Sequence, residues 1–260
     1  MLLGGIMSKN VVFMIAIADD EKHMDAHMRQ RSRDTGYEWS LKSWKNWCDK
    51  NDVQLFVMDT PICPINEMKL TWQRYFVLDI LVENGVDYNQ VCMVDADTII
   101  HPDTPNFFEM TEGKYCGVVN PVNEWILKSL EIYSKFMFNG KMIPFWEYIN
   151  GGFQVFNESH KPFLDTMKNY YLNNKESLLE IQNKYGAGSD QTPLNFLLKE
   201  NNIDVKLLST KFNMQDLVRY EALSEDLTHT KMGWVYHFNT WPKPNPRYWL
   251  EKTYRSLYES

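Results

Sequence analysis

The sequence predicts an α/β protein with a mostly parallel sheet and helices on both faces. Short apolar runs of strand length alternate with amphipathic stretches of helical length, which is the pattern of β-α-β units. One run stops abruptly on Asp95 and Asp97, as buried strands do where they meet the binding crevice of an open sheet. The share of hydrophobic residues, 44%, is that of an ordinary globular protein with a large core.

The strands are predicted from short runs rich in Val, Ile, Leu, Phe and Tyr that end at polar or turn-forming residues. In chain order these runs cover residues 11–18, 53–58, 91–94, 115–119, 153–156, 205–208 and 234–238. Pro61 and Pro64 end the second run, because proline cannot donate to a strand ladder. Cys92 and Cys116 lie inside predicted strands, where we expect them to be small buried hydrophobic residues.

The helices are predicted from apolar residues at helical spacing and from capping signals. They cover residues 37–50, 66–85, 124–138, 161–172 and 190–200, and a last helix starts at Pro246 after a capping Asn245. In the second helix apolar residues recur at every fourth position between a capping Asn66 and a terminating Gly85. Residues 19–33 are strongly charged and predict a polar loop or a loose helix.

Composition limits the classes of function. A formal net charge of -7 argues against a nucleic-acid-binding protein, so any bound nucleotide should be small and carried with its own metal. The cysteines form no C-x-x-C pair, which favours a reducing compartment, and a cytoplasmic protein without a transmembrane segment is expected. With 260 residues the chain needs only one core, so we expect a single domain over residues 1–260, with residues 1–10 as a candidate disordered segment.

The Asp95-Ala96-Asp97 triplet is the most informative motif. Carboxylates two apart on an extended segment project to the same side, and at the end of a buried strand they face the ligand crevice. Two hard oxygen donors there suit a divalent cation that carries a phosphate. The alternative is a solvated turn in which Asp97 caps the structure around Pro102.

A second cluster follows the last predicted strand. His237 ends that strand, and a proline-stiffened loop then presents Lys243. One imidazole with two carboxylates makes a mixed nitrogen and oxygen site that suits Mn²⁺, and the lysine would supply a point charge for a diphosphate. The alternative for His237 is a hydrogen-bonded structural role.

These motifs match one enzyme family in their order along the chain. The sequence resembles the glycosyltransferases of family 8, the group that contains glycogenin and bacterial lipopolysaccharide galactosyltransferases. The family signature H-F-x-G-x-x-K-P-W is matched at His237, Phe238, Lys243 and Pro244. Thr240 stands in place of its glycine and Asn245 in place of its tryptophan.

The other family motifs lie upstream. The N-terminal A-D-D is matched by Ala18, Asp19 and Asp20, although Lys22 occupies the place of the aromatic residue that stacks on the base. The middle motifs are matched at Arg74, at Asn120, at Asn150, Gly152, Val155 and Asn157 of N-x-G-x-x-V-x-N, and at Asp190, Gln191, Leu194 and Asn195 of D-Q-D-x-L-N. Thr192 replaces the second acid of the last motif.

The resemblance implies a Rossmann-like GT-A fold and a retaining glycosyltransferase. It would move a hexose from a UDP-sugar to a glycan or another hydroxyl acceptor, with Mn²⁺ or Mg²⁺ as cofactor. The implied metal ligands are Asp95, Asp97 and His237. The implied donor contacts are Asp19, Asp95, Asn120, Asn150, Gly152 and Lys243. The implied catalytic residues are Arg74, Asp190 and Gln191.

The same motifs allow other interpretations. A sugar nucleotidyltransferase can carry similar acids, but it usually has a glycine-rich basic loop where this chain has Asp19 and Asp20. A nucleotide-sugar-binding protein without turnover is the non-enzymatic alternative. Structural alternatives are an ion-paired Arg74, a simple turn at 151–152 and a helix cap at Asp190. Five aromatic residues are expected to be core residues, with a sugar-binding platform as the alternative: Trp125, Tyr133, Phe145, Trp146 and Tyr148.

Overall fold

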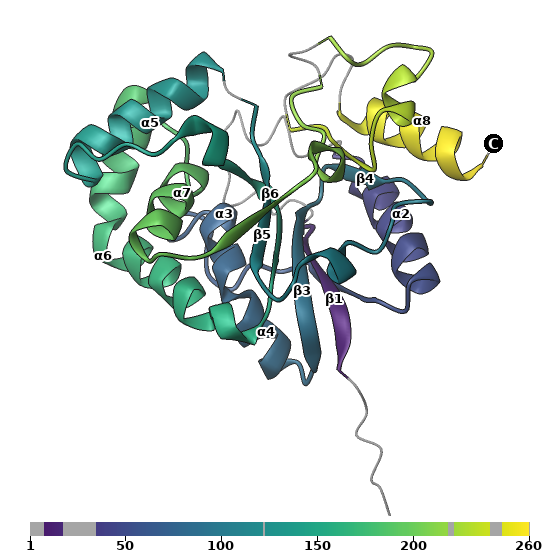
Figure 1. The fold of residues 1–260 in the computed structure, drawn as a ribbon, viewed down its shortest axis with the longest axis horizontal. Helices are drawn as coiled ribbons and strands as arrows, with labels where there is room; N and C mark the ends of the chain where they lie inside the picture. The colour runs from purple at the N-terminus through teal and green to yellow at the C-terminus, as the bar shows by residue number, and fades with distance from the viewer. Residues whose placement is uncertain (1–7, 18–34, 122, 218–220, 240–245, 260) are drawn as a thin grey trace, which may run out of the picture.

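A six-stranded sheet with helices on both faces forms the centre of the protein (Figure 1). The structure is a computed structural model that describes residues 8–17, 35–121, 123–217, 221–239 and 246–259. The strands are β1 (Lys9–Ile15), β2 (Gln54–Met58), β3 (Tyr88–Asp95), β4 (Thr98–Ile100), β5 (Tyr115–Val119), β6 (Ile149–Phe156), β7 (Val205–Leu208) and β8 (Val235–His237). The α-helices are α2 (Tyr37–Lys50), α3 (Leu70–Gln73), α4 (Val77–Glu83), α5 (Glu124–Met137), α6 (Lys161–Tyr185), α7 (Gln191–Glu200) and α8 (Pro246–Tyr258).

The strand order in the main sheet is β2-β1-β3-β6-β5-β7. The pairs β1–β2, β1–β3 and β5–β7 are parallel, and β6 alone runs antiparallel to both of its neighbours. Five strands therefore share one direction, which confirms the predicted fold class. The carboxyl ends of β3 and β5 lie at the same edge of the sheet, with the start of β6 between them.

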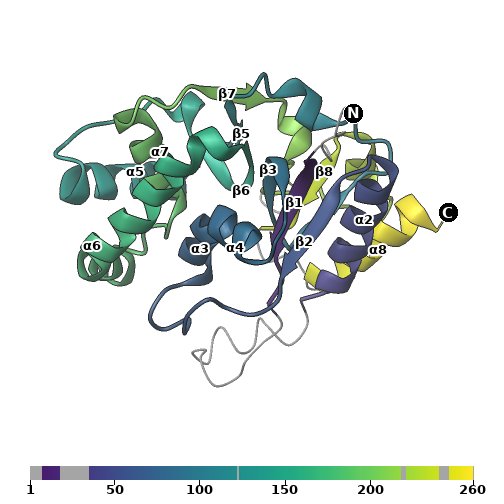
Figure 2. The same ribbon diagram turned by 90° about the horizontal axis from the view of Figure 1, so that it is seen from below.

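Strand alternation divides the core between the two faces of the sheet. Val11, Phe13 and Met93 point to the face covered by α3 to α7, whereas Val12 and Cys92 point to the face covered by α2. The two helical layers lie on opposite sides of the strands in both ribbon views (Figures 1 and 2). A third apolar cluster joins α8 to β4 and β8.

The β4–β8 pair is an element that the sequence did not predict. β4 is a three-residue strand immediately after Asp97, and it pairs antiparallel with β8 so that Thr98 lies opposite His237. A short apolar segment after a turn carries little periodic signal, so only the pairing itself reveals it. This pair brings the end of β8 to the end of β3.

The predicted helix over 66–85 is wrong in its start and its continuity. It begins at Leu70, the cap position is Lys69 rather than Asn66, and a 3₁₀ turn at Arg74–Phe76 separates α3 from α4. The Gln73 amide explains the late start, because its oxygen accepts from Ile62 N and its nitrogen donates to the carbonyls of Cys63 and Met68. These bonds hold residues 62–68 in turns. Gly85, at φ 68°, follows the helix as predicted.

Two other elements are longer than predicted. Helix α6 continues past residue 172 to Tyr185, because Leu178 and Ile181 carry its buried face through a polar stretch. Strand β6 begins at Ile149 and is buried throughout, so residues 151–152 lie inside a strand and do not form a turn. The other predicted strands and helices agree with the structure to within a few residues, and Cys92 and Cys116 are buried as expected. The predicted loop or loose helix over 19–33 and the capping Asn245 lie outside the described residues.

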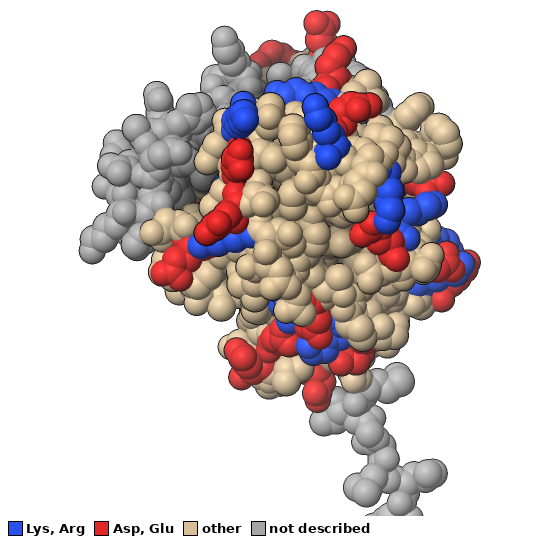
Figure 3. All heavy atoms as spheres, turned by 90° about the vertical axis from the view of Figure 1, so that its left-hand side faces the viewer, with Lys and Arg blue, Asp and Glu red and all other residues tan. Residues whose placement is uncertain are grey.

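On the side that carries α5 and α6, side chains of both charges occur together around a largely uncharged centre (Figure 3). Within the described ranges, none of the helices combines the length and the apolar character that crossing a bilayer requires.

Candidate functional site

A cleft of about 610 Å³ opens at the edge of the sheet where β3 and β5 end. Its walls are polar, and most of the lining residues follow strands or begin helices. The lining comprises Thr71, Arg74, Asp95, Asn120, Asn123, Trp125, Ile126, Asn150, Gly151, Gly152, Ser189, Asp190, Gln191, Asp216, His237 and Asn239. This is the position at which open α/β sheets bind their ligands.

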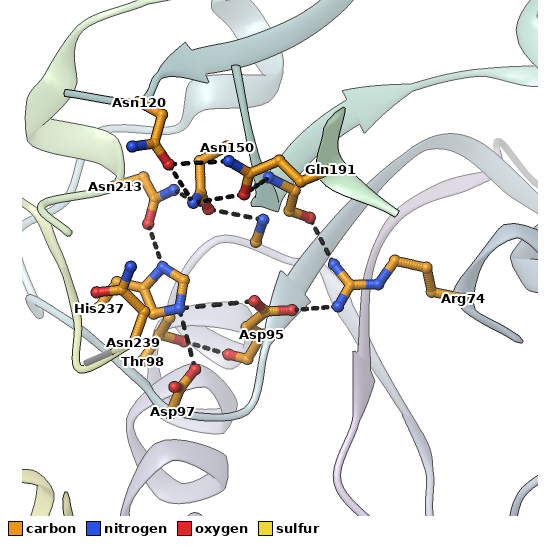
Figure 4. Close-up of polar contacts among 12 residues, drawn as sticks. Arg74, Asp95, Asp97, Thr98, Asn120, Asn150, Gln191, Asn213, His237 and Asn239 are labelled. Atoms are coloured by element: carbon orange, nitrogen blue, oxygen red, sulfur yellow. Dashed lines mark hydrogen bonds and ion pairs between the residues drawn. The ribbon is translucent and has the colours of Figure 1, made fainter. Parts of the chain in front are cut away.

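Three ligand-type side chains meet at one side of the cleft. The Nε2 atom of His237 lies 3.1 Å from Asp97 Oδ1 and 3.5 Å from Asp95 Oδ2 (Figure 4). One donor atom from each of the three residues lies within 4.8 Å of the others. Asp95 ends β3, Asp97 follows in the turn, and His237 ends β8, so the β4–β8 pairing assembles the cluster. Its mixed nitrogen and oxygen donors suit Mn²⁺.

Gly152 leaves the space that this cluster needs. A Cβ atom at this position would lie 2.5 Å from Asp95 Oδ2 and 2.6 Å from His237 Cε1. Both distances are well inside van der Waals contact, so any side chain would push the carboxylate and the imidazole apart. The neighbouring Gly151 differs, because its Cβ would meet nothing closer than 3.5 Å.

The charges in the cluster shift one another's protonation. Burial alone would lower the pKa of His237, but Asp97 and Asp95 outweigh burial and raise that pKa above its ordinary value. Burial alone would raise the pKa of Asp97, but His237 and Arg74 reverse this effect and lower it. Without a cation the cluster therefore favours a protonated histidine, and a bound cation would take the place of that proton.

Asn213 orients the imidazole from behind. Its Oδ1 atom lies 3.0 Å from His237 Nδ1, and its Nδ2 donates to Asn150 Oδ1 at 3.0 Å. Because the amide presents its oxygen to the ring, Nδ1 carries the proton and Nε2 faces the carboxylates. Asn213 is buried, so water does not compete for this contact.

Arg74 connects the carboxylates of the cleft. One terminal nitrogen lies 3.0 Å from Asp95 Oδ1, and the other donates to the carbonyl of Gly151 at 2.6 Å. Its Nε atom lies 3.8 Å from Asp190 Oδ2 and has no hydrogen-bond partner among the described residues. Burial opposes the charge, but Asp95 and Asp190 raise the pKa of Arg74, which stays protonated. The interpretation of Arg74 as an ion-paired residue is correct, and the ion pair lies in the cleft.

Asp190 is held by three neighbours. Its Oδ2 accepts a hydrogen bond from the Tyr75 hydroxyl at 3.0 Å, and its Oδ1 accepts one from Ser189 Oγ at 3.0 Å. The residue occupies the cap position of α7, but its side chain makes no capping hydrogen bond. Asp190 is therefore the cap residue that the alternative interpretation expects, but its carboxylate turns to Arg74 and the cleft.

A network of side-chain amides forms the floor of the cleft. Asn150 Nδ2 donates to Asn120 Oδ1 and to Gln191 Oε1, at 2.9 Å and 3.0 Å. Gln191 Nε2 donates to Asn120 Oδ1 at 3.1 Å, while Gln191 Oε1 also accepts from Gly151 N (Figure 4). Through Asn150 and Asn213 this network reaches His237.

The structure brings together every predicted site residue that it describes. These are Arg74, Asp95, Asp97, Asn120, Asn150, Gly152, Asp190, Gln191 and His237. Asp19 and Lys243 lie outside the described residues. Sequence reasoning missed Asn213, Asp216 and Asn239. No local pattern marks Asn213, but Asn239 lies two residues after His237 in the same motif and could have been included.

The predicted burial of five aromatic residues is correct for two of them. Tyr133 and Tyr148 are fully buried. Trp125, Phe145 and Trp146 are 42%, 47% and 59% exposed, and Trp125 lines the cleft. Trp125 lies in the first turn of α5, and it is not among the buried residues of that helix.

Comparison with known proteins shows the fold. No protein-family model matches the chain, and no curated sequence matches it significantly. A solved glycosyltransferase involved in the glycosylation of the major capsid of PBCV-1 aligns with a TM-score of 0.57 at 8% identity, over 94% of this chain and 98% of its own. This likeness confirms the predicted GT-A architecture.

Two further solved structures align over most of the chain with lower scores. The galactosyltransferase LgtC, solved in complex with donor and acceptor sugar analogs, aligns at 13% identity over 96% of both chains, with a TM-score of 0.46. The glycosyltransferase GlyE of Streptococcus pneumoniae TIGR4 aligns at 14% identity over 96% of this chain and 62% of its own, with a TM-score of 0.48.

Proposed function

We propose that the protein is a divalent-metal-dependent glycosyltransferase that moves a hexose from a UDP-sugar to a hydroxyl acceptor. One observation carries the proposal: the donor atoms of Asp95, Asp97 and His237 converge within 4.8 Å at the ligand-binding edge of a GT-A sheet. The fold likeness to a glycosyltransferase and the order of the family motifs support the same reaction.

The cluster suits a divalent cation. Asp95, Asp97 and His237 would hold Mn²⁺ or Mg²⁺, and Gly152 keeps the space beside them free. When bound, the ion would neutralise the diphosphate that leaves the sugar. By resemblance, Lys243 would contact the β-phosphate and Asp19 the base.

The remaining cleft residues would bind the sugar and orient it. In the transfer, the bond between sugar C1 and the phosphate oxygen breaks, and its electron pair leaves with UDP. The acceptor oxygen forms a bond to C1 from the same face, and its proton passes to the departing phosphate. Arg74 would hold Asp95 and Asp190 at the donor, and the amides of Asn120, Asn150 and Gln191 would offer hydrogen bonds to sugar hydroxyls.

Retention of configuration is part of the proposal. Both oxygens of Asp190 are engaged by Tyr75 and Ser189, and both ends of the Gln191 amide are engaged in the network. Gln191 is a neutral amide and therefore a poor nucleophile, which supports the front-face route over a covalent intermediate on this residue. An NMR time course should show the donor's anomer in the first-formed product, and the opposite anomer would refute retention.

Product analysis tests the proposed function. The purified chain is incubated with UDP-glucose or UDP-galactose, with Mn²⁺ or with EDTA, and the released nucleotide is identified. We expect Mn²⁺-dependent formation of UDP that Asp97→Ala abolishes. Pyrophosphate in place of UDP would indicate nucleotidyl transfer. Thermal stabilisation by UDP-sugar and Mn²⁺ without product would indicate a binding protein.

A further inference from the structure

The cleft wall contains a single Trp, Tyr or Phe side chain among its described residues, and this is Trp125. It lies in the first turn of α5 and is 42% exposed. Within the described part of the chain its indole N–H has no hydrogen-bond partner. A tryptophan left half-exposed in a polar cleft combines a flat apolar surface with a free donor, which is the combination that binds amphipathic ligands.

Gly188 constrains the position of the indole ring. A Cβ atom at Gly188 would lie 2.8 Å from Trp125 Cη2, so the ring edge packs directly on that glycine. Ser129, one turn further along α5, accepts a hydrogen bond from Gly188 N at 3.1 Å. Asn123 caps the helix by accepting from Ile126 N. A ring held in this way loses little freedom when a ligand stacks on it.

Trp125 is not one of the three cation-ligand residues, and a path of contacts through the cleft connects it to them. His237 contacts Asp95, Asp95 pairs with Arg74, and Arg74 faces Asp190. Gly188 lies two residues before Asp190 and packs on the Trp125 ring. The diphosphate of a donor would lie at the cluster, and Trp125 lies at the other end of this path, where an acceptor would meet the donor sugar.

The chemistry beside the ring indicates the class of acceptor. Asn123 lies two residues before Trp125, and its Nδ2 is 3.4 Å from Asp216 Oδ2. Asp216 N donates to Asn239 Oδ1 at 2.8 Å, so three connected polar residues share the cleft lining with Trp125. A pyranose ring has an apolar C–H face and a rim of hydroxyl groups, which matches an aromatic surface edged by amides and a carboxylate. We propose that Trp125 is the acceptor platform of this cleft and stacks on a pyranose ring, an inference that rests on the proposed function.

Acceptor kinetics test the platform. Transfer from the active UDP-hexose is measured with methyl β-D-galactopyranoside, methyl β-D-glucopyranoside, lactose and, as an alcohol without a ring, glycerol. Trp125→Ala should raise the KM for the glycosides about tenfold or more, as expected for loss of a stacked aromatic contact. Trp125→Phe should retain most of the affinity. The KM for the glycosides should rise by a larger factor than the KM for the donor does.

Two further variants sharpen the test. Trp146→Ala is the matched control, because Trp146 is exposed but does not line the cleft, and it should behave as wild type. Gly188→Ala should raise the glycoside KM without removing the ring, because its methyl group displaces the indole. Equal loss of UDP affinity and glycoside affinity in Trp125→Ala would place the nucleotide on the ring and overturn the proposal.

Saturation-transfer NMR with the same glycosides, UDP and Mn²⁺ separates this inference from the proposed function. If the wild type turns over no donor but binds the glycosides, and Trp125→Ala loses that binding, the platform stands and the transferase proposal fails. If UDP is released but the glycosides neither bind nor accelerate its release, the transferase proposal stands and a pyranose platform is refuted. Identical behaviour of Trp125→Ala and Trp146→Ala would refute it as well.

Discussion

Two buried histidines close together in sequence have opposite surroundings. His229 is fully buried among Tyr236, Phe238 and Trp249, and its Nε2 atom contacts Thr253 Oγ1 at 3.1 Å. His237 is equally buried, but it faces two carboxylates and an asparagine oxygen.

The two histidines differ in pKa because different groups surround their rings. Burial lowers the pKa of His229 to about 4, and Asp226 opposes this only in part, so the ring is neutral. The carboxylates beside His237 reverse the effect of burial and raise its pKa. A histidine packed by aromatic rings contributes to the core, whereas one that completes a carboxylate pair can exchange its proton for a cation.

Removing each histidine should have opposite consequences. His237→Ala should abolish detectable Mn²⁺ binding and reduce transfer by at least about 100-fold, since loss of one preorganised charge partner costs about 3 kcal/mol. His229→Leu should leave both properties intact and lower the free energy of unfolding by about 1–3 kcal/mol. Calorimetric Mn²⁺ titration and thermal unfolding measure the two effects. Normal Mn²⁺-dependent turnover in His237→Ala would eliminate the metal assignment.

The adjacent glycines of β6, Gly151 and Gly152, should differ in their effect on Mn²⁺ binding. Gly152→Ala should weaken Mn²⁺ binding by about 1–3 kcal/mol, the usual cost of overpacking, because its methyl group enters the space between Asp95 and His237. Gly151→Ala meets only ordinary contacts and should bind Mn²⁺ nearly as wild type does. Mn²⁺ affinity measured by electron paramagnetic resonance compares the two. Equal affinities would mean that the cluster does not use this space.

Asn213 and Thr253, which contact the rings of His237 and His229, should also differ in their effect on Mn²⁺ binding. Asn213→Leu removes the acceptor for His237 Nδ1 and should weaken Mn²⁺ binding by about tenfold, because such partners fix the ring of a ligating histidine. Thr253→Val removes the partner of His229 and should cost about 1 kcal/mol of stability with unchanged Mn²⁺ affinity. Wild-type Mn²⁺ affinity in Asn213→Leu would contradict the orienting role.

The pH dependence of stability should have opposite signs at the two sites in the metal-free protein. The folded-state pKa of His237 is raised, so its contribution is fully present below pH 6.5 and is lost as the pH rises through that pKa. The pKa of His229 is lowered to about 4, so its contribution is present above pH 6.5 and is lost as the pH falls toward 4.

Urea unfolding of wild type, His229→Leu and His237→Leu across pH 4 to about 8 checks these signs. The effect is at most about 3 kcal/mol for His229, from its shift between 6.5 and about 4. His229→Leu should lose less stability between pH 6.5 and pH 4 than the wild type does. An unchanged pH profile in both variants would show that neither ring titrates differently on folding.

Most elements of the fold could be predicted because their signals are local. Trp44 and Trp47 are buried at helical spacing in α2, and β5 is a short apolar run. Both signals depend on residues a few positions apart. The errors occur where a distant contact overrides local preference. Gln73 holds residues 62–68 out of a helix, and β4 exists only because β8 pairs with it. The exposure of Trp125 was missed because spacing alone does not reveal which helix face remains uncovered.

The sequence alone determined the order of strands and helices and the set of chemical groups at the ends of the strands, because periodicity and residue type act within a few positions. Only the tertiary structure decided that His237 closes on Asp95 and Asp97, that Arg74 joins Asp95 to Asp190, and that Asn213 lies behind the ring. These contacts join segments far apart in the chain, and their geometry depends on strand pairing and side-chain packing, which no local pattern encodes.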